Sequence, residues 1–247
     1  MNVDSGHVAA VIRKEVREYR RNRFILLTMA ILPVVFTAIP VSNTFRVSAS
    51  ATTTTVRALV GSNLLLVLLT AVILPATIAA YSVIGERDQG TLEPVLTTPV
   101  RREELVMGKA LAAIVPAVAV SYVLFAILAI AVRFGATQKV VDAFWQPAPF
   151  IAEALFAPLL ATFAIWVGMA ISARASDVRV AQQLSTLASL PPLAVIALMQ
   201  YQVIPLTVGV AVAIGAGFAI VDTAAWRVVT GLFDPERLIT GFGQTRP

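Results

Sequence analysis

The sequence has no cysteine and a single histidine, His7, among its 247 residues. Without cysteine, disulfide bonds and thiolate metal sites are excluded. Because no His, Asp or Glu cluster has metal-ligand spacing, we expect no metal site, and no Ser–His–Asp group can be assembled. Charge is also scarce: 13% of the residues are charged, against roughly 25% in soluble domains. Water is therefore not the main solvent of this chain.

A phosphate-binding loop of the form G-x-x-x-x-G-K-[ST] is also missing. The chain therefore has no ATPase site of its own, and we expect neither catalytic residues nor a bound cofactor. Apolar residues are abundant instead: 58% of the chain is hydrophobic, and the mean hydropathy is +0.83. These values are typical of a membrane protein.

Five apolar stretches contain no Asp, Glu, Lys or Arg and are long enough to cross a membrane, which takes about 20 helical residues. The last stretch is about twice that length, so we expect it to fold back. Polar residues and a proline at 200–205 mark the break, and the Pro191–Pro192 pair predicts a kink. The sequence thus predicts an all-α, six-span protein from the stretches 24–45, 58–85, 110–132, 154–173 and 180–221.

Basic residues are unequally divided between the two sides of these spans, with fifteen on the side of both termini and four on the other. The positive-inside rule therefore places both termini in the cytoplasm. Charges between apolar runs suit a membrane better than nucleic acid, so we expect no nucleic-acid partner. We interpret 1–247 as one transmembrane domain, with an amphipathic helix at 6–23, a bundle at 24–225 and a tail at 226–247.

The segment 6–23 has helical spacing of apolar residues, with Val8, Ile12, Val16 and Tyr19 on one face and Val11 beside them. Such a helix lies in the membrane interface, with its cations near anionic headgroups. Two interpretations stay open: a simple membrane anchor, or an elbow helix that transmits movement to the first span. The basic residues of this interfacial helix are Arg13, Lys14, Arg17, Arg20 and Arg21.

Span six carries small residues every four positions, at Gly209, Ala213 and Gly217. This stripe predicts close helix packing, either ordinary or at a dimer face. Few charges border the spans: the sequence places Glu153 near an outer end and Asp222 near the inner end of span six, at headgroup depth. The uncharged middle favours a hydrophobic, amphipathic or lipid-like cargo.

The loop between spans two and three, residues 85–105, combines mixed charges with ordered turn and apolar residues. Gly90 permits a sharp turn, and Pro99 favours a fresh helix start. Glu103 and Glu104 fall in the first turn of span three, where they complement the helix dipole. This pattern predicts a compact knob between two long helices.

This loop resembles the signature of ATP-binding-cassette permeases of the type-2 exporter family. The match comprises Glu86-Arg87-Asp88-x-Gly90-Thr91-Leu92-Glu93-x-x-Leu96-x-Thr98-Pro99, then Glu104-Leu105 and Gly108-Lys109. Arg101 departs from the serine-like cap usual there. The resemblance implies a coupling helix that docks on an ATPase subunit, although Glu86 could instead pair with a basic residue of the N-terminal helix. The docking contact would be formed or supported by Glu86, Arg87, Gly90, Thr91, Leu92, Glu93, Val95 and Leu96.

The resemblance also implies partners. They are two ATPase subunits carrying ATP and Mg²⁺, and a second permease copy or homologue, in the lipid of a prokaryotic cytoplasmic membrane. A lesser ATPase contact is implied at Asp177 and Arg179, where a plain turn is an equal alternative and Ser176 or Asp177 could cap the next helix. Two other functions stay open: an ion-gradient carrier or channel, and a membrane scaffold that transports nothing.

Overall fold

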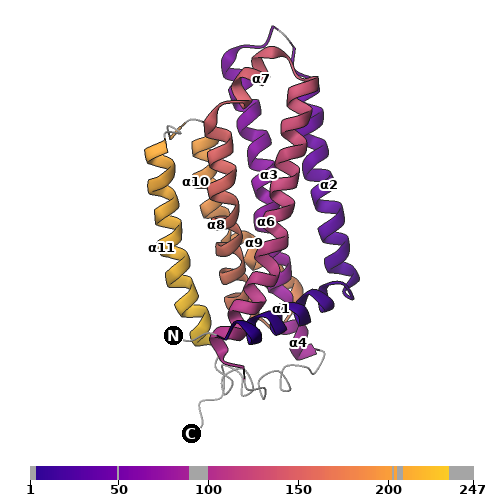
Figure 1. The fold of residues 1–247 in the computed structure, drawn as a ribbon, viewed down its shortest axis with the longest axis vertical. Coiled ribbons are helices and arrows are strands. Elements are labelled where there is room, and N and C mark those ends of the chain that lie inside the picture. The colour runs from indigo at the N-terminus through magenta and orange to yellow at the C-terminus, as the bar shows by residue number, and fades with distance from the viewer. Residues whose placement is uncertain (1–3, 49, 89–99, 202, 205–207, 234–247) are drawn as a thin grey trace.

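The computed structural model describes residues 4–48, 50–88, 100–201, 203–204 and 208–233 (Figure 1). Every regular element in these ranges is a helix. The helices are α1 (Ser5–Tyr19), α2 (Arg23–Phe45), α3 (Thr53–Tyr81), α4 (Ile84–Asp88), α6 (Arg102–Gly135), α7 (Gln138–Phe144), α8 (Pro147–Ser172), α9 (Val178–Ala188), α10 (Leu190–Gln200) and α11 (Val208–Leu232).

The six predicted spans are confirmed: α2, α3, α6, α8, α9 with α10, and α11 are long and apolar enough to cross a membrane. The fifth span is interrupted at Ser189, and Pro191 and Pro192 lie in the first turn of α10. A proline there removes no hydrogen bond, because the first N–H groups of a helix have no intrahelical acceptor.

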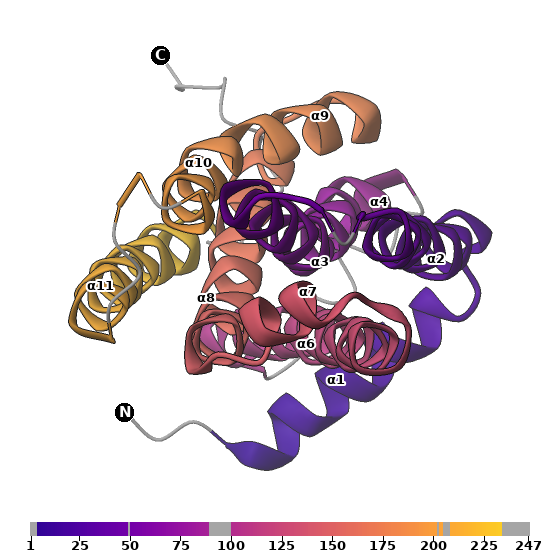
Figure 2. The same ribbon diagram turned by 90° about the horizontal axis from the view of Figure 1, so that it is seen from above.

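α3 is the central helix of the bundle and packs against α2, α6, α8, α9 and α10. It is buried along most of its length, whereas α2 and α11 lie at opposite edges (Figure 2). Pro75 lies within α3 and is itself buried. The bundle has two distinct ends: α1 and α4 lie at one, hereafter the α1 end, and α7 lies at the other, the α7 end (Figure 1).

The core is divided along the bundle. At the α7 end it is aromatic: the rings of Phe125, Phe144 and Phe150 lie with centroids 5.1 to 5.9 Å apart. At the α1 end aliphatic residues of α1, α3, α6 and α8, among them Val11 and Val106, pack together with Trp166 and Phe233. The amphipathic helix α1 thus contributes to the protein core and does not only lie on its surface.

Glu153 and Asp222, which were expected near the ends of their spans, are both buried within the bundle. Glu153 of α8 is 2% exposed and accepts a 2.7 Å hydrogen bond from the Ser121 hydroxyl, and Asp222 of α11 is 6% exposed. α11 continues beyond the predicted tail boundary to Leu232, because 226–232 remain largely apolar, so Asp222 lies within the helix body. Both carboxylates are thus buried by protein, and their placement at headgroup depth stays a prediction.

The small-residue stripe of α11 lies on its exposed side. Gly209, Ala213 and Gly217 are exposed, and a Cβ atom added at either glycine would meet nothing within 4 Å. α11 instead packs on α8 through Gly215, where an added Cβ would lie 2.9 Å from Leu155 Cδ2. The stripe therefore makes no packing contact inside the described chain, and its role at a dimer face stays a prediction.

Candidate coupling site

α1 lies directly against the first turns of α6. A Cβ atom at Gly108 would lie 2.6 Å from Cβ of Val11 and 3.3 Å from the carbonyl oxygen of Val8. Only glycine leaves room for the backbone of α1 at this distance. Val8 and Val11 are both buried as a result, while Val16 on the predicted apolar face is 41% exposed. The face of α1 that meets α6 is thus centred on Val11 and Glu15.

A network of charged groups fills this contact on the side of α4. Lys109 of α6 is 2% exposed, and its Nζ donates to Glu15 Oε1 at 2.7 Å, Glu86 Oε1 at 2.9 Å and the carbonyl of Ser82 at 3.1 Å. Lys14 of α1 also binds Glu86, and its Nζ lies 3.1 Å from Glu18 Oε1. We call these five residues, Lys14, Glu15, Glu18, Glu86 and Lys109, the charge network.

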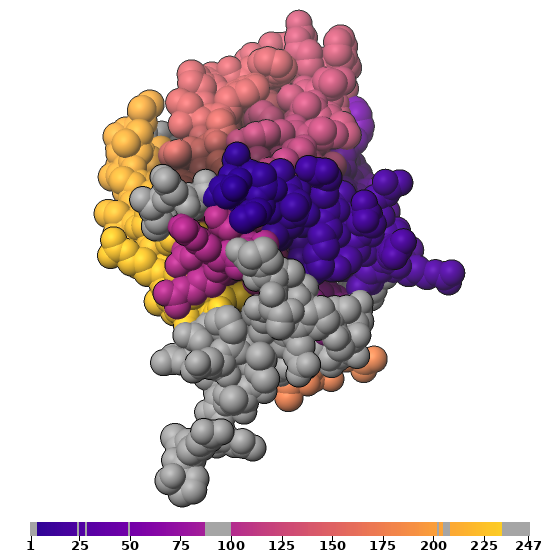
Figure 3. All heavy atoms as spheres, turned by 60° about the horizontal axis from the view of Figure 1, so that its bottom comes forward, coloured from indigo at the N-terminus to yellow at the C-terminus, as the bar shows by residue number. Residues whose placement is uncertain are grey.

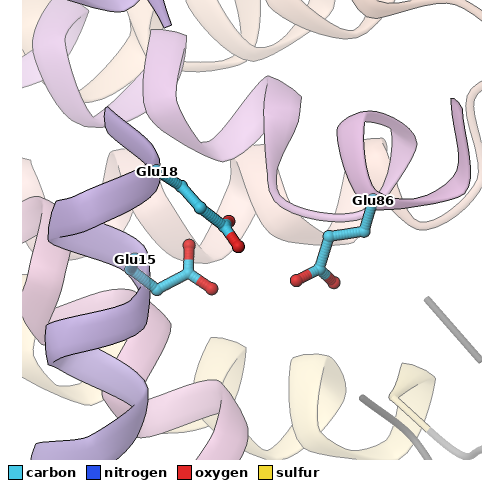
Figure 4. A group of neighbouring side chains, drawn as sticks. All are labelled: Glu15, Glu18 and Glu86. Carbon is cyan, nitrogen blue, oxygen red and sulfur yellow. The ribbon is translucent and has the colours of Figure 1, made fainter. Parts of the chain in front are cut away.

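The three carboxylates of the charge network point toward one another from α1 and α4 (Figure 4). Their oxygens lie within 4.8 Å of one another, as in some metal sites. Here, however, the ammonium groups of Lys14 and Lys109 already bind the carboxylates, so a cation would have to displace them. We therefore assign the cluster to ion pairing and not to metal binding.

Ion pairing also determines the protonation of α1. Burial alone would raise the pKa of Glu15, but the ammonium groups of Lys109 and Lys14 outweigh it and lower the pKa. Burial alone would lower the pKa of Lys14, and Glu15 and Glu86 reverse this and raise it. Both groups are therefore charged at neutral pH, and α1 is joined to α4 and α6 by ionic hydrogen bonds in which Glu15, Glu86 and Lys109 are buried.

A second polar contact joins the start of α1 to the start of α6. Glu104 is 2% exposed and accepts hydrogen bonds from the backbone N–H of Asp4 at 2.8 Å and of Arg101 at 3.1 Å. The imidazole Nδ1 of His7 lies 2.9 Å from Glu104 Oε2, the oxygen that also accepts from the Arg101 N–H. Glu104 thus supplies the helix cap that the Arg101 side chain, which has no acceptor, cannot supply.

These contacts lie on both sides of residues 89–99, which the structure does not describe. Glu86, upstream of that segment, is bound by Lys14, and Glu104, just downstream, is bound by Asp4 and His7. Figure 3 shows α1 lying across the α1 end of the molecule beside the first turns of α6. α1 therefore binds described residues on both sides of the segment 89–99.

Ser172, at the end of α8, binds the break between α3 and α4. Its hydroxyl donates to the carbonyl of Ala80 at 2.9 Å and accepts from the backbone N–H groups of Val83 at 3.3 Å and Ile84 at 3.4 Å. Ser172 is fully buried, so water cannot replace these bonds. The turn that orients α4 is thereby held against α8.

Replacing Ser172 by alanine is expected to destabilise the protein by about 1–3 kcal/mol, because buried backbone groups lose their partner. Thermal unfolding of the purified protein measures this loss. Ser42→Ala is the matched control, since the Ser42 hydroxyl only bonds the carbonyl of Ile39 in its own helix, at 3.0 Å. Equal unfolding temperatures for the two variants would contradict the capping role of Ser172.

The predicted site residues fall into three groups. Glu86 is buried and bound by Lys14. This agrees with the alternative interpretation, in which Glu86 pairs with a basic residue of the N-terminal helix. Arg87 lies in α4, whereas Gly90, Thr91, Leu92, Glu93, Val95 and Leu96 lie outside the described residues. Asp177 caps α9 by accepting from the N–H groups of Arg179 at 2.6 Å and Val180 at 3.3 Å, and its predicted ATPase contact stays a prediction.

Of the predicted interfacial residues, Arg13, Arg17, Arg20 and Arg21 are exposed, while Lys14 turns toward the charge network. Glu15, Lys109 and Ser172 are site residues that were not predicted from the sequence. Lys109 could have been identified from the sequence, because it is the last residue of the family pattern and lies at the start of an apolar span. Ser172 had none, since its partners Ala80 and Ile84 are distant in sequence.

A comparison with protein families finds one model that matches, described as ABC-2 family transporter protein, over residues 9–239. A search of the curated proteins finds no match. The matched range includes α1 from its second turn, all six spans and the segment between α4 and α6. The chain therefore belongs to the ABC-2 transporter family, as a multi-pass membrane permease.

Proposed function

We propose that this permease is the transport subunit of an ATP-driven exporter, and that α1 transmits force from the segment 89–99 to the spans. The observation that supports this proposal is the position of α1, which binds the residues on both sides of that segment through Glu86 and Glu104. A partner that displaces the segment would displace α1, α4 and the start of α6 together.

The contacts of α1 suit the transmission of force. Glu15, Glu86 and Lys109 of the charge network are almost fully buried, so separating their ion pairs would leave buried charges unpaired, which is strongly unfavourable. α1 is followed after three residues by α2, and α4 follows the central helix α3 just as closely. Movement of the α1 end therefore acts on α2, α3 and α6 at once, which favours the elbow interpretation of α1 over the simple anchor.

The partners follow from what the chain lacks. Permeases of this family work with ABC ATPases, and the sequence has no phosphate-binding loop. We propose that two ATPase subunits, with ATP and Mg²⁺, dock at the α1 end, and that a second permease completes the pathway. The α1 end would then be cytoplasmic, in agreement with the exposed Arg13, Arg17, Arg20 and Arg21. The apolar spans favour a hydrophobic or lipid-like cargo.

Replacing Leu92 by glutamate tests the docking role. We expect ATP-dependent transport in vesicles to fall at least tenfold, because a charge would have to be buried in the contact with the ATPase. The ATPase should then no longer copurify with the permease. Protein abundance and thermal unfolding should not change. Phe134→Glu is the control, since Phe134 is 84% exposed near the far end of α6. If the Leu92 variant keeps its ATPase and its transport, the docking assignment is wrong.

Glu86→Gln gives the complementary result. Because Glu86 accepts from two lysines inside the protein, we expect this variant to lose thermal stability first and coupling only as a consequence. Comparison of Leu92→Glu with Glu86→Gln therefore distinguishes a residue that contacts the ATPase from one that stabilises the permease. Loss of ATPase binding by the Glu86 variant at unchanged stability would place Glu86 in the docking contact itself.

A second candidate is an ion-gradient carrier, and the burial of Glu153 and Asp222 favours it. One oxygen of Glu153 and both oxygens of Asp222 are buried without a hydrogen-bond partner in the described part of the chain. Buried ionisable groups in a membrane are often proton sites. A protonophore would abolish transport by such a carrier at constant ATP, whereas the exporter would require ATP and tolerate the protonophore.

A further inference from the structure

Glu153 of α8 lies in a contact of three helices, together with Ser121 of α6 and Val67 of α3. Its side chain is 2% exposed, and Ser121 is fully buried. The Ser121 Oγ atom lies 2.7 Å from Glu153 Oε1 and 3.4 Å from the carbonyl oxygen of Val67. The other carboxyl oxygen, Oε2, is buried without a hydrogen-bond partner in the described part of the chain. One oxygen of this carboxyl is thus paired and the other is not.

An ionised carboxylate does not suit this contact. It would carry its charge on two buried oxygens, of which only one accepts a hydrogen bond. Burying a charge without a partner costs far more than burying a neutral acid. A protonated carboxyl can use the same 2.7 Å contact in the opposite direction, with its O–H donating to Ser121 Oγ. The Ser121 hydroxyl has a single hydrogen, which it can then donate to the Val67 carbonyl, so that both hydrogens have an acceptor.

The charged and titratable groups of the surrounding helices do not bind Glu153 in the described part of the chain. On α6, the Tyr122 hydroxyl donates to the carbonyl of Ala154 at 3.1 Å, and Arg133 lies about 18 Å along the helix from Ser121. On α11, Asp222 lies about 10 Å along the helix from Gly215, which packs on α8. The charged groups of α3 and α7 at this end are Arg57, Lys139 and Asp142, which line a cavity.

That cavity, of about 590 Å³, extends from the α7 end toward Glu153. Its lining includes exposed polar residues of α7, among them Lys139, so the cavity is open to the medium at this end. Its buried lining includes Leu64 of α3 and Pro149 of α8, which lie about one helical turn from Val67 and Glu153. Water in the cavity therefore comes within one turn of the carboxyl.

We propose that Glu153, with Ser121 and the Val67 carbonyl, forms a proton-binding site that is loaded from the α7 end through this cavity. The ligand is a proton and not a metal ion, because the 2.7 Å between Ser121 and Glu153 is a hydrogen-bond distance and would have to widen to admit an ion. The site does not by itself make the chain an ion-gradient carrier, which would also have to release the proton at the α1 end. Binding requires neither ATP nor the ATPase, so failure of this proposal is distinguishable from failure of the exporter function.

Infrared spectroscopy of the purified protein in lipid vesicles provides the test, because a protonated carboxyl has a C=O stretching band that a carboxylate lacks. We expect one component of this band at neutral pH to be lost in Glu153→Gln and kept in Asp222→Asn, which removes the other buried carboxyl without a partner. Ser121→Ala should shift the component, because the O–H of Glu153 loses its acceptor. Ser62→Ala is the matched control, since the Ser62 hydroxyl only bonds the carbonyl of Leu59 in its own helix, at 2.9 Å.

Deuterium exchange tests the route by which the proton reaches the site. After transfer into D₂O the Glu153 component shifts as its O–H becomes O–D, and the rate of this shift measures access. Ala143→Phe fills the cavity and is expected to slow the shift several-fold. Thr54→Phe, at an exposed position of α3 outside the lining, is expected to leave the rate unchanged. Circular dichroism and thermal unfolding confirm that each variant is folded.

The remaining outcomes overturn the proposal. Absence of a component specific to Glu153 would show that the carboxyl is ionised. Loss of that component on addition of sodium at constant pH would show that a metal ion displaces the proton. Equal effects of Ser121→Ala and Ser62→Ala would exclude the contact with Ser121, and equal exchange rates in both phenylalanine variants would exclude the cavity as the route.

Discussion

Replacement of Lys109 by methionine is expected to destabilise the permease by about 3–5 kcal/mol and to abolish transport. Methionine has a similar length, so the main change is the loss of the ammonium group that donates to Glu15, Glu86 and the Ser82 carbonyl. Two carboxylates that are nearly inaccessible to water would then lack their principal cation. Thermal unfolding of the purified protein and ATP-dependent uptake into vesicles measure the two effects.

Two further variants identify the cause. Lys139→Met is the matched control, because Lys139 is exposed on α7 and only donates to the carbonyl of Ala51 at 3.1 Å. The triple variant Lys109→Met, Glu15→Gln, Glu86→Gln removes the buried charges together and should recover most of the stability. Lys14 keeps its ion pair with Glu18 in that variant. No recovery in the triple variant would mean that Lys109 acts through packing and not through charge.

Gly108→Leu is expected to detach α1 from α6 and to abolish transport while the six spans remain folded. Even the first added carbon would lie 2.6 Å from Val11 Cβ, and the backbone of α1 lies too near for a side chain to fit. With α1 displaced, Lys109 would lose Glu15, and Glu86 would lose Lys14. Accessibility of a cysteine introduced at Val11, which is buried in the parent, measures the detachment.

Gly231→Leu is the control for this experiment. Gly231 is a helical glycine near the end of α11, and an added Cβ would meet nothing within 4 Å. We expect this variant to retain transport and to leave Val11 inaccessible. If Gly108→Leu exposes Val11 and transport continues, α1 is an anchor with no part in coupling, and the elbow interpretation is wrong.

The Lys109 and Gly108 variants disrupt the same contact by different means. The first leaves the backbone of α1 free to stay in place and removes the ionic contacts, whereas the second displaces the helix with every charge present. Loss of transport in both, together with normal ATPase binding, would show that α1 acts after docking. This is the order of events that the contacts of α1 with Glu86 and Glu104 predict.

The class of the fold follows from the pattern of apolar residues alone. Apolar runs of one bilayer length can only satisfy their backbone groups as helices, so the number of spans follows from composition and length. The break at 200–205 and the interruption near Pro191 followed from local chemistry in the same way. The family pattern around Glu86 and Gly108 then identified a permease, as the match over residues 9–239 bears out.

Which side chains contact one another follows only from the packing of the helices in the tertiary structure. The amphipathic pattern predicted Lys14 at the headgroups, and the family resemblance implied Glu86 in the docking contact, with pairing to the N-terminal helix as the open alternative. Only the packing of α1 on α6, which brings Glu15 and Lys109 within 2.7 Å, shows that these charges pair inside the protein. It likewise buried Glu153 and Asp222, whose depth depends on where each helix ends. Helical periodicity predicts which face of a helix is apolar. Which helix packs against that face depends on the arrangement of the whole bundle.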